Sequence, residues 1–259
     1  MPNTATHYIY GQLVLRQLHP LLRKFILEHK SMYDLGLQGP DIFFYYQPYR
    51  RSDVAAYGSS RHDESGRRVF EPVLGAVHND DAASAYLLGN ACHYMLDSRC
   101  HPYVYEHCPD FSSHMRMEAA LETQFMRRYY MGGDRRVLLP AKGLDYASMA
   151  KVWPEQSPQI IKKCVRRMRF YTALIDRAGF LVPTEAKRDR LPASLLLPRD
   201  VPRAQSEHVK RLNECFFGSV IDCVFLMRDL VDAIGREPYR LEKGFERNYQ
   251  GTLHLSRVK

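Results

Sequence analysis

The sequence has few of the features that mark secreted, membrane-spanning or disulfide-stabilised proteins. Its first residues, MPNTATHYIYGQLVLRQL, contain neither the basic start nor the apolar centre of a signal peptide. No run of about 18 apolar residues occurs, and the best candidate, CFFGSVIDCVFLMRDLV, is interrupted by Asp222 and Arg228. We therefore expect a cytoplasmic protein in which this segment forms a buried helix.

Cysteine is also sparse. The six cysteines are too few to form a disulfide framework in 259 residues, and no two of them form a C-x-x-C pair. Cys92, Cys100 and Cys108 recur every eight residues, which keeps them near one face of a helix. We interpret them as buried, reduced thiols. No alternating strand pattern and no internal repeat is present.

Positive charge is in excess, because 37 Lys and Arg residues face 29 Asp and Glu residues, which gives a formal charge of +8. Much of the excess lies in two runs, which contain Arg127, Arg128, Arg135 and Arg136, and then Lys162, Lys163, Arg166, Arg167 and Arg169. Runs of this kind usually form solvated helix faces. They also suit phosphates or an acidic lipid surface, so a phosphate-bearing substrate and peripheral contact with an anionic membrane both stay open. No obligate protein partner is evident.

Apolar residues at three- and four-residue spacing predict an all-α fold. Helices are expected over the ranges 5–28, 80–100, 112–130, 158–178 and 203–234, with a short one around Met149. The polar stretch 49–68 is interpreted as an irregular loop, and the Pro-rich stretch 183–202 as a lid-like loop or a subdomain boundary. We expect a helical core at 1–139, with the helices of 140–259 packing on it as one continuous domain.

Histidines are concentrated in the N-terminal half, where all but two of the eleven lie within the first 114 residues. His93 and Asp97 are four residues apart on a predicted helix, so their side chains share one face at about 5–6 Å. That helix is strongly apolar, and a carboxylate buried on it needs a partner. His114 and Glu118 repeat the same spacing on the next predicted helix.

Further donors are placed to complete a metal site. Pro102 disfavours the helical conformation in the residue before it, so we expect the helix to end at His101 and turn that side chain toward a neighbouring site. Asp41 follows a Gly-Pro break, His62 lies in the predicted polar loop, and His7 begins the first helix. Imidazole and carboxylate groups on two helices suit several metals, zinc first. We therefore expect a multi-helix bundle with a metal cluster in its core.

Taken in order, these motifs resemble the zinc-dependent phospholipase C family. The features that carry the resemblance are Thr6-His7, Pro40-Asp41, His62, H-x-x-x-D…H-P over 93–102 and H-x-x-x-E over 114–118. This family includes the alpha-toxin-like enzymes and is distantly related to zinc nucleases that cut single strands. Each motif is weak alone, whereas eight candidate ligands of the right type in the right order form a specific signal.

The resemblance implies an enzyme that uses two or three zinc ions to hydrolyse a phosphoester. It assigns one zinc to Asp41, His62, His93 and Asp97, a second to His101, His114 and Glu118, and a third to His7, with Asp97 bridging. Asp41 is also the implied general base. The substrate stays open between a phospholipid, a nucleotide and a small soluble diester.

Two alternatives remain. The dipeptide His62-Asp63 is compatible with an HD-type phosphohydrolase, although this interpretation leaves the second histidine–carboxylate pair without a role. Secreted members of the zinc-dependent phospholipase C family begin at a tryptophan that completes the third zinc site, whereas the only tryptophan of this sequence is Trp153. A metal-binding helical protein of this fold with little or no catalytic activity is therefore the second alternative.

Overall fold

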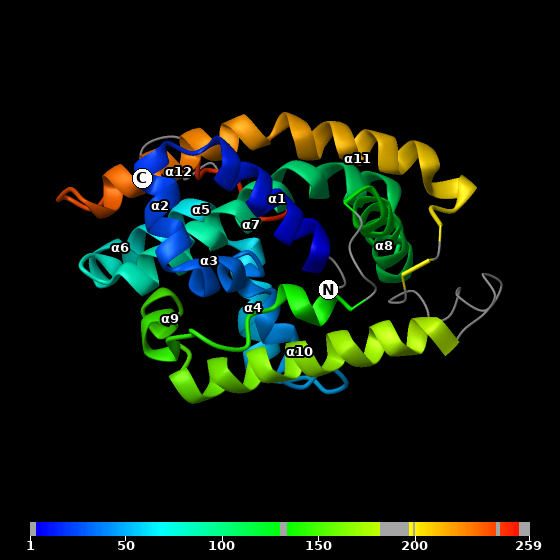
Figure 1. Cartoon of the computed structure of the whole chain (residues 1–259), viewed down its shortest axis with the longest axis horizontal. Helices are drawn as coiled ribbons and strands as arrows, with labels where there is room; N and C mark the ends of the chain where they lie inside the picture. Colours follow the sequence, from blue (N-terminus) through cyan, green and yellow to red (C-terminus); the bar gives the residue numbers. More distant parts are fainter. Residues whose placement is uncertain (1–3, 130–133, 182–196, 199, 242–243, 254–259) are drawn as a thin grey trace.

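The computed structural model describes residues 4–129, 134–181, 197–198, 200–241 and 244–253, and helices dominate them (Figure 1). The elements in chain order are α1 (Thr4–Gln17), α2 (Pro20–Glu28), α3 (Lys30–Gly36), η1 (Gly39–Tyr45), α4 (Asp53–Asp63), α5 (Gly66–Phe70), η2 (Glu71–Val73), α6 (Leu74–Val77), α7 (Asp81–His107), α8 (Phe111–Arg128), η3 (Arg135–Leu138), α9 (Tyr146–Val152), α10 (Pro158–Leu181), η6 (Arg203–Gln205), α11 (Ser206–Gly218) and α12 (Val220–Ile234). The described residues contain two isolated antiparallel bridges and no β-strand. The predicted all-α fold is confirmed.

Helix α7 forms the centre of the molecule. Its N-terminus is capped by Asp80, whose Oδ1 accepts a hydrogen bond from the Ala83 amide at 2.9 Å. Helices α1, α3, α9, α11 and α12 all pack against it. The closest approach is that of α3, because a Cβ added at Gly89 would lie 2.2 Å from the Tyr33 carbonyl oxygen. Because α7 is covered on several sides, its polar residues Asn90, His93, Asp97 and Ser98 are buried among apolar neighbours.

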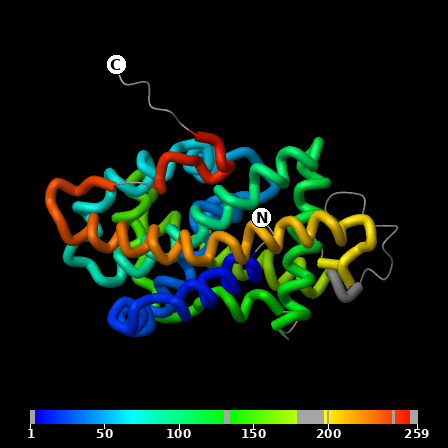
Figure 2. The backbone as a smooth tube through the Cα atoms, turned by 90° about the horizontal axis from the view of Figure 1, so that it is seen from above, coloured from blue at the N-terminus to red at the C-terminus, as the bar shows by residue number. Residues whose placement is uncertain are grey.

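The C-terminal helices flank this centre on two sides. In Figure 1, α11 and α12 run along the top edge and α10 along the bottom, with α1, α3 and α7 between them. Figure 2 shows α11 and α12 end to end along the long axis of the molecule. Among the described helices, none combines the length and the apolar character that a membrane crossing requires.

Two of the predicted helices are each divided in two. The range 5–28 is broken at Pro20, which begins α2, and His19 caps that helix by accepting a hydrogen bond from the Leu21 amide at 3.4 Å. The range 203–234 is broken at Ser219, whose hydroxyl lies 3.0 Å from the Tyr10 hydroxyl of α1. Neither break moves a candidate ligand, because all eight lie outside both junctions.

The interpretation of 49–68 as an irregular loop was wrong. This stretch contains α4 and α5, which are capped by Ser52 and Ser65 respectively. Its polar residues are caps and solvent-facing positions, and they hid the helical periodicity. Of the predicted connection 183–202, only residues 197–198 and 200–202 are described.

The predicted end of the central helix at His101 was also wrong. Helix α7 continues to His107, with Pro102 inside it. Proline removes one backbone hydrogen bond from a helix. The flanking residues Cys100 and Val104 are buried in the core, so tertiary packing outweighs that loss. His101 therefore continues the helical face of His93 and Asp97.

Candidate metal centre

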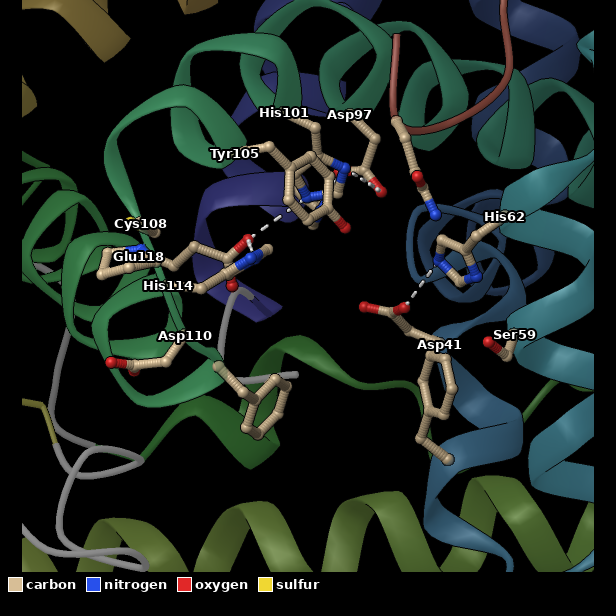
Figure 3. A pocket seen from close by; sticks show the side chains of 15 residues that line it. Asp41, Ser59, His62, Asp97, His101, Tyr105, Cys108, Asp110, His114 and Glu118 are labelled. Carbon is tan, nitrogen blue, oxygen red and sulfur yellow. Dashed lines mark hydrogen bonds and ion pairs between the residues drawn. The ribbon is translucent and has the colours of Figure 1, made fainter. Parts of the chain in front are cut away.

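The structure brings all eight predicted ligands together around one cavity of about 460 Å³. Figure 3 shows side chains that line this cavity. Seven of the eight ligands line it, while His93 is fully buried behind them. Their donor atoms form three groups, in each of which all donor atoms lie within 4.8 Å of one another. The groups are His7, His93 and Asp97; Asp41, His62 and His93; and His101, His114 and Glu118.

The first group centres on Asp97 of α7, which is 5 % exposed. Its Oδ1 lies 3.3 Å from His7 Nε2 of α1, and its Oδ2 lies 3.1 Å from His93 Nε2 one turn earlier on α7. The two imidazole rings are stacked with centroids 4.0 Å apart. One carboxylate therefore faces two histidines from different helices, which is the arrangement expected of a bridging ligand.

The second group joins η1 to the end of α4. Asp41 Oδ1 lies 3.1 Å from His62 Nε2, and Figure 3 shows both side chains facing the cavity. His62 thus lies in the last turn of a helix and not in the predicted loop. Gly39 makes the approach to α7 possible, because its φ is +49° and an added Cβ would lie 2.5 Å from His93 Cδ2.

The third group joins the C-terminal part of α7 to the first turns of α8. Glu118 Oε1 lies 2.9 Å from His114 Nε2 and 3.4 Å from His101 Nε2 (Figure 3). His101 Nδ1 also lies 3.9 Å from Asp97 Oδ2, so the third group adjoins the first. Helix α8 begins at a capping box made by Asp110 and Ser113, and this box fixes the turn that carries His114.

Three of the histidines use Nδ1 to donate a hydrogen bond to a backbone carbonyl. His62 donates to the Gly58 carbonyl at 2.7 Å, His93 to the Leu37 carbonyl at 3.1 Å and His101 to the Tyr249 carbonyl at 2.9 Å. In each case Nε2 is left facing a carboxylate of the cavity. A carbonyl on one ring nitrogen and an open second nitrogen is the usual arrangement of a metal-binding imidazole.

Several buried polar atoms of the groups have no hydrogen-bond partner. These atoms are His93 Nε2, His7 Nδ1 and Glu118 Oε2. The His93 nitrogen lies near the Asp97 carboxylate but is not aligned with it for a hydrogen bond. An unpaired buried polar atom costs free energy, and a bound cation would remove that cost. The nitrogen and oxygen donors present fit zinc.

The electrostatics of the centre favour a bound cation. Burial disfavours the charged His101 imidazolium, but Asp97 and Glu118 raise its pKa to about 9. Burial also disfavours the Glu118 carboxylate, yet His114 and His101 lower its pKa to about 2. By contrast, burial and the neighbouring His93 lower the pKa of His7. The carboxylates therefore remain charged and hold positive charge nearby.

The cavity also contains residues that the sequence motifs did not indicate. Phe44, Ser59, Tyr105, Phe111 and Gln250 line it together with the candidate ligands. Tyr105 follows His101 by four residues, so a helix continued through Pro102 would have indicated its position. No local pattern signals Gln250, because it reaches the cavity from the far end of the chain.

The residue next to His62 lies apart from the three groups. Asp63 is exposed, and its Oδ1 accepts a hydrogen bond from Gln250 Nε2 at 2.6 Å. Neighbouring positions on a helix point about 100° apart, so His62 and Asp63 do not face the same space. The described groups of donors do not include Asp63.

The fold and the cavity define an all-helical protein with buried histidine and carboxylate groups able to bind metal. The model of the family described as zinc dependent phospholipase C matches residues 6–167, which is more than half of the sequence. The chain belongs to this family. The search of curated proteins and the search of solved structures each found no match.

Proposed function

We propose that this protein is a zinc-dependent phosphoric ester hydrolase that cleaves a phosphodiester at the cavity between α1, α4, α7 and α8. The observation that supports the proposal is the convergence of three histidine–carboxylate groups on one cavity in a chain of this family. The residues that would hold the ions are Asp41, His62, His93 and Asp97 for one, His101, His114 and Glu118 for another, and His7 with Asp97 for a third.

Zinc in such a site lowers the pKa of bound water toward about 7 and offsets negative charge on a phosphoryl group. Asp41 is the proposed general base, because its carboxylate faces the cavity at one end of the donor set. Burial opposes its ionisation, but surrounding positive charge, including that of His62 and His93, lowers its pKa. The Asp41 side chain is therefore ionised at neutral pH.

The charge of the cavity supports a metal-dependent reaction. Its described lining includes the carboxylates of Asp41, Asp97, Asp110 and Glu118 and no lysine or arginine. An anionic phosphoester would be repelled by this lining unless cations were bound there. The aromatic rings of Phe44, Tyr105 and Phe111 give the same cavity an apolar wall, which suits an organic group attached to the phosphate.

The proposal is tested by removing a central ligand. His93→Ala or Asp97→Ala is expected to remove at least one zinc equivalent and to abolish hydrolysis of a chromogenic phosphodiester, because each removes a proposed metal ligand. Elemental analysis of purified protein gives the zinc stoichiometry, and the assay is run with added zinc. Unchanged zinc content in both variants would contradict the proposed centre.

Asp63→Ala is the matched control, because Asp63 is charged and adjacent to His62 but is exposed and is not a member of the three groups. We expect it to keep both zinc and activity, and loss of metal there would favour the HD-type alternative. A wild-type protein with full metal occupancy and persistent inactivity would favour the metal-binding protein without turnover.

A further inference from the structure

The last described segment, residues 244–253, folds back over the N-terminal part of the chain; we call it the C-terminal strap. The Gly66 amide donates to the Arg247 carbonyl at 2.8 Å, and the Arg67 amide donates to the Phe245 carbonyl at 2.7 Å. The Tyr94 hydroxyl of α7 also donates to the Arg247 carbonyl at 2.9 Å. The strap is thus fixed to α5 and α7, although it lies outside the residues 6–167 that match the family.

Within the strap, Tyr249 contacts the candidate metal centre directly. Its carbonyl oxygen accepts the hydrogen bond from His101 Nδ1 at 2.9 Å. Its ring is fully buried, with its centroid 5.2 Å from the His62 ring and 5.8 Å from the His93 ring. The next residue, Gln250, lines the cavity. One segment therefore contacts histidines that together belong to all three donor groups.

The position of the strap over α7 depends on Gly251. This residue has a φ of +79°, and an added Cβ would lie 2.3 Å from Pro102 Cγ and 2.6 Å from the Ser98 carbonyl oxygen. Pro102 has no amide hydrogen to bond that carbonyl and is the neighbour of His101. The strap lies directly against the turn of α7 that carries His101, and a side chain at position 251 would lift it.

The carbonyl groups that accept from His62 and His93 belong to the part of the chain that matches the family. Gly58 lies one turn before His62 on α4, and Leu37 precedes η1. His101 differs, because its partner comes from 148 residues further along the chain. The position of this imidazole therefore depends on the strap being in place.

We propose that the C-terminal strap is a positioning element of the metal centre, in which the Tyr249 carbonyl fixes His101 so that Nε2 faces Glu118 and the bound ion. The inference rests on the proposed metal centre. A neutral imidazole protonated at Nδ1 presents a lone pair at Nε2, and the hydrogen bond made by Nδ1 sets both the tautomer and the ring orientation. Without the carbonyl, the ring of His101 would be free to rotate or to protonate at the other nitrogen.

Gly251→Ala tests this proposal, because the added Cβ collides with Pro102 and Ser98 and displaces the strap. We expect the affinity for one zinc equivalent to fall about 10- to 100-fold, the usual effect of losing a hydrogen bond to a metal-binding histidine. The equivalent bound by Asp41, His62 and His93 is expected to remain. Zinc stoichiometry and competition with a chromogenic chelator measure the two affinities separately.

Two variants separate positioning from general destabilisation. Gly143→Ala imposes the same left-handed strain at a φ of +70°, but its Cβ would contact only Ser31, so zinc affinity should not change. Tyr249→Phe removes the hydroxyl that bonds Asn90 and keeps the carbonyl, so it should also retain the wild-type zinc stoichiometry. If Gly251→Ala does not fold, Asn248→Ala takes its place, because it removes the 2.8 Å bond from the Thr252 amide that closes the strap turn.

A readout that needs no metal completes the test. The His101 Nδ1 hydrogen should give a slowly exchanging downfield proton resonance in wild-type protein, assigned by its loss in His101→Gln. It should disappear in Gly251→Ala and persist in Gly143→Ala. Its absence from the wild type, or equal zinc affinities in wild type and Gly251→Ala, would overturn the positioning role. A wild type that shows the resonance but binds no zinc would instead overturn the proposed function alone.

Discussion

Helix α8 carries two buried glutamates one turn apart, and they have different partners. Glu118 faces the imidazoles of His101 and His114. Glu122 instead forms an ion pair with Arg135 at 2.6 Å and accepts a hydrogen bond from the Ala5 amide at 2.5 Å. Arg135 is 1 % exposed and also pairs with Asp176 of α10 at 2.7 Å. The two carboxylates are thus equally buried but belong to different networks.

The difference shows that burial of a carboxylate does not by itself indicate a metal site. A guanidinium is permanently charged, fills its donors with the two carboxylates and offers no lone pair to a cation. Although burial disfavours its charge, Glu122 and Asp176 raise the pKa of Arg135 above its ordinary value. An imidazole can exchange its proton for a metal, and Glu118 Oε2 has no hydrogen-bond partner. The chemistry of the partner, rather than burial, separates the structural network from the candidate metal centre.

The largest effect is expected from Arg135→Ala, which leaves Glu122 and Asp176 buried without their cation. Breaking a buried ion pair in this way costs about 3–5 kcal/mol of unfolding free energy. Urea unfolding of the two proteins measures the difference. Arg136→Ala is the matched control, since its pair with Asp134 is exposed and should contribute less than about 1 kcal/mol. Equal effects of the two substitutions would contradict the structural role of Arg135.

The same substitution at each of the two glutamates should separate an effect on metal binding from an effect on stability. Glu118→Gln is expected to weaken one zinc equivalent by about 100-fold or more, because removing a ligand should exceed the loss of a supporting hydrogen bond. Glu122→Gln should keep the zinc stoichiometry and lower the unfolding free energy instead. Elemental analysis and chelator competition on both variants measure this contrast. Loss of zinc from Glu122→Gln alone would reverse our assignment of the two networks.

The pH dependence should also differ between the networks. In metal-free protein the pKa of His101 is about 9, above its ordinary 6.5, because Asp97 and Glu118 outweigh the effect of burial. That proton stabilises the metal-free fold fully below pH 6.5, and the contribution is lost as the pH rises through 9. Zinc must displace the same proton, so its affinity for the third group should rise about tenfold per pH unit from pH 7 to 9.

Chelator competition across that pH range measures the slope, and His101→Gln should flatten it. In the other network, burial raises the pKa of Glu122 to about 7 although Arg135 opposes the shift, so the Arg135–Glu122 pair changes charge near pH 7 and not near pH 9. A zinc affinity that is independent of pH in wild-type protein would show that His101 does not exchange a proton for the metal.

Much of the candidate site could be predicted from local spacing. The His93–Asp97 and His114–Glu118 pairs need only a helix to share a face, and both lie on helices in the structure. His7, Asp41 and His62, which lie outside α7 and α8, were proposed as further donors, and the family resemblance supported all eight by their order. The two errors close to the site, at His62 and His101, concern local conformation and left both residues in the predicted donor set.

The role of Arg135 could not be predicted in the same way. It stands in a run of basic residues that we interpreted as a solvated surface, but only the structure places it against Glu122 and Asp176. Other members of the basic runs, such as Arg127 and Lys162, are exposed as expected. Charge patterns along a sequence do not show which side chain turns inward when its partners lie on other helices.

The sequence by itself determined the helical character and which residues are candidate donors, because these depend on residue type and on short spacings along the chain. Only the tertiary structure decided that α7 continues through Pro102, that Glu122 pairs with Arg135, and that Tyr249 contacts His101. The last two contacts join residues 13 and 148 positions apart in the chain. Contacts over such distances are fixed by the packing of the whole core, which no local pattern encodes.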